Sequence, residues 1–138
     1  MRFPGPLPVA QAFARGRIMV APSRAESMPY IVLETIAAQV PLLTTAVGGV
    51  PEIFGPFADW LGPSGDPADL AGRILTELRR PAAERAARAG ELAAYVRNRF
   101  SLENMAETVL SAYREALALR SVPKRRRAGD AADLVNEA

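Results

Sequence analysis

The chain has 138 residues, and its composition, 49% hydrophobic and 23% charged, is ordinary for a globular domain with a core of its own. It contains no histidine and no cysteine, so a Ser-His-Asp hydrolase, a disulfide framework and a typical zinc site are excluded within this sequence. The formal net charge of +2 is too small to indicate a nucleic-acid partner, and no apolar run approaches the ~18 residues of a membrane span.

The first third of the chain alternates strand-like and helix-like patterns. We predict a strand remnant entering a turn, a short helix, a strand, a helix and a second strand over residues 1–7, 8–14, 17–21, 29–39 and 40–46. The apolar run at 17–21 is typical of a parallel strand buried on both faces. Pro29 suits the first position of the helix, where a missing N–H costs nothing.

A turn, a short helical segment and a helix follow. Gly48 and Gly49 form the turn, residues 51–54 start a helical turn, and residues 58–61 are a candidate for a short strand. Asp66 is a good N-cap for the next helix. That helix is predicted to bury one stripe of side chains, namely Leu70, Ile74, Leu75 and Leu78.

The remainder is predicted to be helical and then irregular. Pro81 ends one helix and opens another that reaches about Arg99, with an apolar face of Ala89, Leu92, Ala93, Val96 and Phe100. Ser101 caps a last helix with apolar residues at helical spacing, namely Leu102, Met105, Val109, Leu110, Tyr113 and Leu117. From Ser121 the pattern stops, and we expect a disordered polar tail.

Alternating strands and helices predict an α/β fold, a partial Rossmann-like three-layer domain with a short parallel sheet of three or four strands. Ligands of open parallel sheets bind beyond the carboxyl ends of the strands. The loop at 22–28 and the turn at 46–51 both follow such ends, so we expect them to open on one side of the sheet.

Two acids lie near this side. Glu26 precedes the helix predicted to start near Pro29, and Glu34 lies about one and a half turns into it. The free N–H groups and the positive dipole at the start of that helix favour a diphosphate. Glu34 is too far along the helix to compete for phosphate, yet it can accept hydrogen bonds from sugar hydroxyls.

As a set, Glu26 and Glu34 eight positions apart, Pro22 and Ser23 before them and the Gly48–Glu52 segment after them resemble the family-4 retaining glycosyltransferases. The similarity extends from about Phe3 to Leu119. It implies the C-terminal, nucleotide-sugar donor-binding part of a GT-B fold, which has two Rossmann-like domains and a cleft between them.

The resemblance also implies roles for individual residues. Glu34 matches the acid that holds the ribose hydroxyls, and Glu26 matches the acid that contacts the donor sugar and is often assigned a catalytic role. Tyr30 and Ile31 match positions whose backbone N–H groups meet the diphosphate, and Gly48 and Gly49 match a glycine pair that shapes the donor loop. Family members often have glycine where this chain has Pro29, which lacks an N–H.

The length of the chain departs from the family. The N-terminal acceptor domain and the first β-α unit of the donor domain, which brings the basic residues that neutralise the diphosphate, are absent from these 138 residues. We therefore expect residues 1–119 to be an incomplete donor domain and residues 120–138 a polar basic and acidic tail. We expect a glycosyltransferase fragment with little or no activity alone, which needs a missing acceptor domain or chain as partner.

Other functions remain open at this point. The main alternative is a non-catalytic nucleotide-sugar binding module or a remnant that needs a partner chain, and a basic-tailed nucleic-acid binder is less favoured because no basic recognition helix is present. No cofactor or metal is implied, since no Asp-x-Asp motif follows a strand. We expect a cytoplasmic bacterial protein, with a weak contact of the Lys124–Arg127 run to the inner membrane face as a further possibility.

Overall fold

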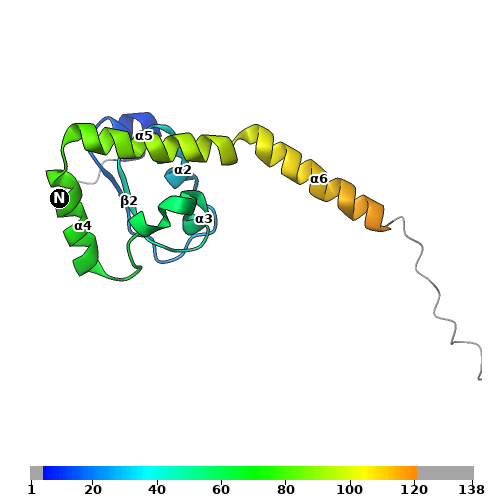
Figure 1. Cartoon of the computed structure of the whole chain (residues 1–138), viewed down its shortest axis with the longest axis horizontal. Helices are drawn as coiled ribbons and strands as arrows, with labels where there is room; N and C mark the ends of the chain where they lie inside the picture. The colour runs from blue at the N-terminus through cyan, green and yellow to red at the C-terminus, as the bar shows by residue number, and fades with distance from the viewer. Residues whose placement is uncertain (1–4, 121–138) are drawn as a thin grey trace, which may run out of the picture. The chain divides into compact units, whose positions relative to one another are not determined.

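The computed structural model describes residues 5–120. The chain divides into two compact units, Met1–Ser101 and Leu102–Ala138 (Figure 1). The elements of the first unit are α1 (Val9–Phe13), β1 (Met19–Ala21), α2 (Tyr30–Ala37), β2 (Leu42–Thr44), α3 (Val50–Phe54), the 3-10 helix η1 (Gly55–Trp60), α4 (Pro67–Arg79) and α5 (Ala82–Arg99).

The sheet of the first unit is short and parallel. β1 and β2 pair with Met19 opposite Leu42 and Ala21 opposite Thr44, and α2 connects the two strands. Just beyond β2, Thr45 forms a single parallel bridge with Gly62. The α/β class with a short parallel sheet is confirmed, although the described residues form two strands and one bridge where three or four strands were expected.

Burial of the strands is lower than predicted. All three residues of β1 are only half-buried, as are Leu42 and Leu43 of β2, so the prediction of a strand buried on both faces is wrong. In a sheet of two strands each strand has an edge, and solvent reaches the side chains from there.

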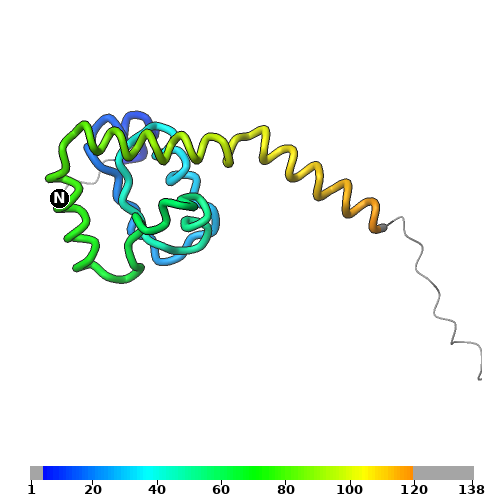
Figure 2. Tube along the Cα trace, in the orientation of Figure 1, coloured from blue at the N-terminus to red at the C-terminus, as the bar shows by residue number. Residues whose placement is uncertain are grey.

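One hydrophobic core joins α2, α3 and α5, and α2 packs against α5 (Figure 2). The buried apolar side chains are Val32, Ile36, Val50, Ile53, Phe54, Leu61, Leu92, Ala93 and Val96. Full burial of an aliphatic or phenyl side chain stabilises the fold by about 1.5–3 kcal/mol. The apolar face predicted for the helix over 81–99 is confirmed, with Ala89 and Phe100 half-buried at its margins.

Residues 55–60 form η1, so the prediction of a short strand over 58–61 is wrong. Three residues per turn place Phe57 and Trp60 on the same side of a 3-10 helix, and their ring centroids lie 4.7 Å apart. Phe57 also meets the ring of Tyr95 on α5 edge-on at 5.8 Å. The apolar residues of this segment therefore pack as an aromatic cluster, and Trp60 packs against the hydrophobic core.

The start of the chain contains little regular structure. Residues 5–8 form neither helix nor strand, so no strand remnant exists in the described part of the segment 1–7, and residues 1–4 lie outside the description. The short helix predicted over 8–14 is present as α1, which begins after Pro8.

The N-terminus of α4 is capped as predicted. The Asp66 carboxylate accepts hydrogen bonds from the backbone N–H groups of Ala68 at 3.0 Å and Asp69 at 2.9 Å, and Pro67 is the first helical residue. These bonds satisfy two of the donors that every helix N-terminus leaves free.

The buried face of α4 differs from the prediction. Leu70 and Ile74 are half-buried, but Leu75 and Leu78 are 52% and 39% exposed, so the predicted stripe is wrong at those two positions. The buried residue of the helix is Glu77, which is 8% exposed.

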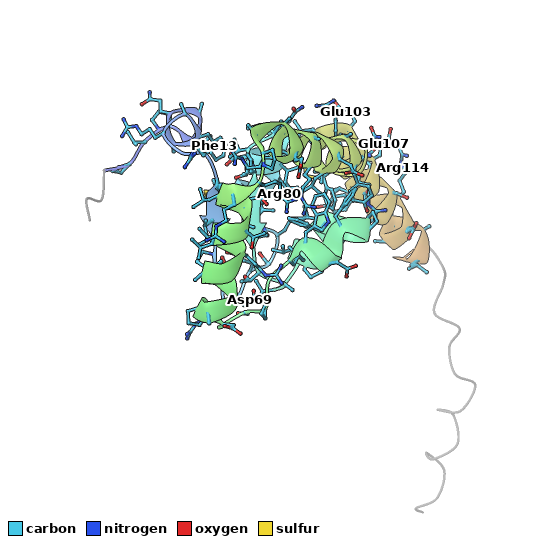
Figure 3. All side chains as sticks on the ribbon, turned by 60° about the vertical axis from the view of Figure 1, so that its left-hand side comes forward. Phe13, Asp69, Arg80, Glu103, Glu107 and Arg114 are labelled. Atoms are coloured by element: carbon cyan, nitrogen blue, oxygen red, sulfur yellow. The ribbon has the colours of Figure 1, made fainter. Side chains whose placement is uncertain are left out.

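An arginine from α5 explains this arrangement. Arg85 Nη1 donates to the carbonyl oxygen of Arg80 at 2.7 Å and to that of Glu77 at 3.4 Å, so it caps the C-terminal end of α4. Arg80 Nε in turn donates to the Glu77 carboxylate at 3.0 Å. Figure 3 shows Asp69 and Arg80 at opposite ends of α4. The end of α4 is thus fixed by charged groups rather than by leucines.

The second unit contains α6 (Leu102–Arg120), which confirms the predicted last helix. Side chains 102–119 are all exposed. The tail predicted from Ser121 lies outside the described residues. Within residues 5–120, no helix combines the length and the apolar character needed to cross a membrane.

Candidate functional site

Two loops meet at the carboxyl ends of β1 and β2. The backbone N–H of Gly49 donates to the Ser27 carbonyl oxygen at 2.7 Å, which links the turn after β2 to the loop after β1. We call residues 22–34 and 45–50 the strand-end rim. Both of its loops follow strand ends on the same side of the sheet, as expected for parallel strands.

The glycines of the turn allow this close approach. Gly48 has a φ of 51°, and a Cβ atom there would lie 1.8 Å from the carbonyl oxygen of Glu26. At Gly49 a Cβ would lie 2.5 Å from the carbonyl oxygen of Ser27. Any side chain at these positions would force the two loops apart.

Glu26 is half-buried and held from its own loop. Its Oε1 atom accepts a hydrogen bond from Ser23 Oγ at 2.7 Å. The carbonyl oxygen of Ser23 accepts hydrogen bonds from Thr45 Oγ1 at 2.6 Å and from Ser64 Oγ at 3.4 Å. Ser23 thus connects the Glu26 carboxylate to the segments that follow β2 and η1.

The site predicted from the sequence gives no role to the hydroxyl groups of Ser23, Thr45 and Ser64. The spacing of Ser23 three residues before Glu26 is the local signal that could have indicated their contact. Thr45 and Ser64 carry no such signal, because they reach Ser23 across 22 and 41 residues of sequence.

The N-terminus of α2 contributes backbone donors to the rim. Pro29 is buried and is the N-cap residue, so the helix begins at Tyr30, one position later than predicted. No side chain caps this end, and the first N–H groups of a helix have no partner within it. Since Pro29 precedes the helix, its missing N–H leaves the N–H groups of Tyr30 and Ile31 in place.

The outer face of α2 carries Tyr30 and Glu34. Tyr30 is 75% exposed, and Glu34, four residues later, is also exposed on the same side of the helix. Val32 and Ile36 point to the opposite side, into the core. Glu34 therefore lies about 6 Å farther along the helix axis than Tyr30, outside the hydrophobic core.

Ile31 lies at the border of the core. It is half-buried, and its carbonyl oxygen accepts a hydrogen bond from the hydroxyl of the buried Thr35 at 2.6 Å. This contact fixes the first turn of α2, whose N–H groups face the rim. The structure thus packs Gly48 against the backbone carbonyl of Glu26 and Gly49 against that of Ser27. The other candidate residues, Tyr30, Ile31 and Glu34, are placed by the helix that follows the same loop.

A separate cavity of about 40 Å³ includes Pro41 and Leu42 at the other end of β2, together with Glu77, Arg85, Arg88 and Trp60. Arg88 stacks on the Trp60 ring, 3.8 Å from its centroid. Burial lowers the pKa of Arg88 and repulsion from Arg80 adds to this, whereas Glu77 and Glu91 act in the opposite direction. The cavity belongs to the junction of α4 and α5, not to the strand-end rim.

Comparison with known families gives one match. The profile of the family described as "Glycosyl transferases group 1" matches residues 1–80, more than half of the 138 residues and a range that contains the whole strand-end rim. No curated protein matches the chain.

Proposed function

The chain belongs to the glycosyl transferases group 1 family, and we propose that its strand-end rim binds a nucleoside-diphosphate sugar, the donor of a glycosyl transfer. The observation that carries this proposal is the contact between the two loops. The hydrogen bond from Gly49 to Ser27 and the packing of Gly48 on Glu26 gather one acid, a glycine turn and an uncapped helix N-terminus at one edge of the sheet.

Each part of the rim has a chemical counterpart in the donor. The N–H groups of Tyr30 and Ile31 and the positive end of α2 suit the diphosphate. Glu34, exposed one turn farther along, accepts hydrogen bonds from the ribose hydroxyls. Glu26 contacts the transferred sugar, and we propose that it has the catalytic role.

The hydrogen bond from Ser23 supports this assignment of Glu26. It occupies Oε1 and leaves Oε2 to accept from the sugar, so the carboxylate is oriented before the donor arrives. In the proposed reaction the sugar moves from the diphosphate to a hydroxyl of the acceptor with retention of configuration. The C–O bond to the diphosphate breaks and the nucleoside diphosphate leaves with its electrons, the acceptor oxygen bonds to the same sugar carbon, and the proton of the acceptor hydroxyl passes to the leaving phosphate oxygen.

Titration calorimetry with nucleoside diphosphates tests donor binding directly. We expect Glu34→Gln to weaken binding about tenfold or more, because a hydrogen bond to a charged group contributes about 1.5–3 kcal/mol and 1.4 kcal/mol corresponds to tenfold. Glu84→Gln, a change at an exposed acid of α5 outside the matched residues 1–80, is the control and should bind like the unaltered chain. No heat with any nucleoside diphosphate, or equal affinity of the two variants, would contradict the proposal.

A non-catalytic nucleotide-sugar binding module is the second candidate. It is favoured by the scarcity of positive charge, since Arg24 is the only lysine or arginine between residues 22 and 50. A single exposed arginine beside two acids neutralises little of the charge that develops on a leaving diphosphate. Binding without transfer by the chain, even with an acceptor-binding partner present, would support this candidate.

A further inference from the structure

Ser23 accepts one hydrogen bond through its backbone and donates another through its side chain. Its carbonyl oxygen accepts from Thr45 Oγ1 at 2.6 Å, across 22 residues of sequence, and its own Oγ donates to Glu26 Oε1 at 2.7 Å. Both distances lie in the range of good O–H···O hydrogen bonds. Two hydrogen bonds through Ser23 therefore connect Thr45, just beyond β2, to the carboxylate of Glu26.

Thr45 is a rigid anchor for this connection. The residue is buried, only 4% exposed, and it forms the parallel bridge with Gly62. The Gly62 N–H donates to the Thr44 carbonyl oxygen at 3.0 Å, and the Ala46 N–H donates to the Gly62 carbonyl oxygen at 2.9 Å, so the backbone is fixed on both sides of Thr45. Since threonine is β-branched, its χ1 angle is restricted as well. The Thr45 hydroxyl is thus a fixed point against which the loop after β1 is placed.

The Glu26 carboxylate depends on this loop for its orientation. Glu26 is half-buried, and among the described residues Ser23 is the donor found for its carboxylate. Side chains occupy a small set of staggered rotamers, and a glutamate in a loop can populate several of them. The apparent affinity of a ligand that requires one rotamer falls in proportion to the fraction of molecules that hold it. Loss of the Ser23 contact would therefore weaken the binding of a ligand to this carboxylate.

We propose that Thr45 is a positioning residue for Glu26 and acts on it through Ser23. By holding the Ser23 carbonyl oxygen, the Thr45 hydroxyl fixes the direction of Ser23 Oγ and with it the Glu26 rotamer that meets the transferred sugar. This role rests on the proposed function, in which Glu26 contacts that sugar. Thr45 itself needs no contact with the donor. It therefore affects the binding of a nucleotide sugar but not that of the nucleoside diphosphate alone, whose proposed partners are on α2.

Thr44 provides a matched comparison. It precedes Thr45 in the chain, it is 5% exposed, and its Oγ1 donates to the Ala21 carbonyl oxygen at 3.0 Å. The two threonines thus make the same kind of buried contact with the segment at the end of β1. Ala21 has no polar side chain, however, so the contact made by Thr44 does not continue to an acid.

Titration calorimetry of the full chain with UDP and UDP-glucose, GDP and GDP-mannose, and ADP and ADP-glucose tests the proposal. For the pair that binds most tightly, the ratio of the two dissociation constants isolates the contribution of the sugar. Thr45→Val keeps the shape of the side chain but removes the hydroxyl. It should weaken the nucleotide sugar about threefold to tenfold and leave the nucleoside diphosphate unchanged. Thr45→Ser, which retains the hydroxyl, and Thr44→Val should both keep the ratio of the unaltered chain.

A double variant tests the path through Ser23. Ser23→Ala removes the donor to Glu26 and should weaken the nucleotide sugar by a similar factor. Adding Thr45→Val to Ser23→Ala should cause no further loss, because no serine hydroxyl then remains to be directed. Far-UV circular dichroism verifies that each variant is folded, and Thr45→Ala, which also lacks the hydroxyl, takes the place of Thr45→Val if that variant does not fold.

The proposal would be overturned by equal weakening of both ligands in Thr45→Val, because this is the effect of a threonine that only stabilises the fold. The same loss of sugar affinity in Thr44→Val, or additive losses in the double variant, would also overturn it. If nucleoside diphosphates bound and Thr45→Val left the ratio unchanged, the donor site would stand without this role for Thr45. If no nucleoside diphosphate bound to the unaltered chain, the proposed function itself would fail.

Discussion

At Gly48 the backbone conformation and the neighbouring loop both exclude a side chain. We expect Gly48→Ala to lower the free energy of unfolding by more than the about 1–3 kcal/mol of a left-handed non-glycine residue, because the new Cβ also collides with the Glu26 carbonyl. Urea unfolding followed by the fluorescence of Trp60, the only tryptophan, measures the loss.

Gly65 provides the control for this substitution. It has a φ of 79°, but no atom lies within 4 Å of the position that a Cβ would occupy, so Gly65→Ala carries the conformational cost without the collision. The difference between the two variants is the contribution of the contact between the loops. Equal losses would mean that the loops separate at no cost and that the strand-end rim is not held together as described.

Candidate site residues could be selected from the sequence only where the chemistry is local. Glu26, Glu34 and the glycine pair were selected from their spacing, and the structure places Glu26 in direct contact with Gly48. The hydrogen bond from Ser23 to Glu26 has a local signal in its spacing, but the support from Thr45 could not be predicted, because it passes through the backbone carbonyl of Ser23, which any residue type would offer.

At the scale of single elements, the Asp66 cap of α4 allows a quantitative prediction. Asp66→Ala removes both hydrogen bonds to the first turn and should lower the free energy of unfolding by about 1 kcal/mol. Asp66→Asn keeps the acceptor and should cost little, which separates the cap from the charge. Thermal or urea unfolding of the two variants measures their free energies of unfolding. An equal decrease in both would mean that the effect comes from the charge of Asp66 and not from its hydrogen bonds.

The junction of α4 and α5 depends on a buried carboxylate. Glu77→Gln keeps the shape of the side chain but removes its charge, leaving Arg80, Arg85 and Arg88 close together. We expect a loss of about 1–3 kcal/mol in the free energy of unfolding, since an ionic hydrogen bond is lost in a poorly solvated place.

Glu84 is the matched control for Glu77. Its carboxylate lies 3.8 Å from Arg80 and its side chain is 61% exposed, so Glu84→Gln should change stability little. If urea unfolding gave the same midpoint for both variants, the packing of the end of α4 would not depend on the Glu77 charge.

Helices were predicted better than the elements between them. The N-cap Asp66, the first-turn Pro67 and the helix-breaking Pro81 allowed the starts of α4 and α5 to be predicted from local chemistry. The segment 55–60 was misjudged because a short apolar run is compatible with a strand or a helix, and its partner Tyr95 lies far along the sequence. The burial of Glu77 rather than Leu75 likewise depends on an arginine from the next helix.

At the scale of the whole molecule, the proposed donor site offers hydrogen-bonding groups but few positive charges. The strand-end rim combines a helix N-terminus, which contributes about 0.3–1 kcal/mol and ~2 when partly buried, with two carboxylates. Each charge-assisted hydrogen bond adds about 1.5–3 kcal/mol. Enzymes lower reaction barriers by about 8–23 kcal/mol, so these groups supply only part of the transition-state stabilisation that glycosyl transfer requires.

We therefore expect the 138-residue chain alone to bind nucleoside diphosphates yet to transfer little or no radiolabelled sugar to hydroxyl acceptors. Adding a protein that supplies an acceptor platform and cationic side chains should produce transfer that Glu26→Gln abolishes and Glu84→Gln leaves unchanged. Turnover by the isolated chain would contradict this expectation, because the strand-end rim would then provide more transition-state stabilisation than its two acids and the helix N-terminus can explain. Transfer that survives Glu26→Gln in the presence of the partner would remove the catalytic role from this carboxylate.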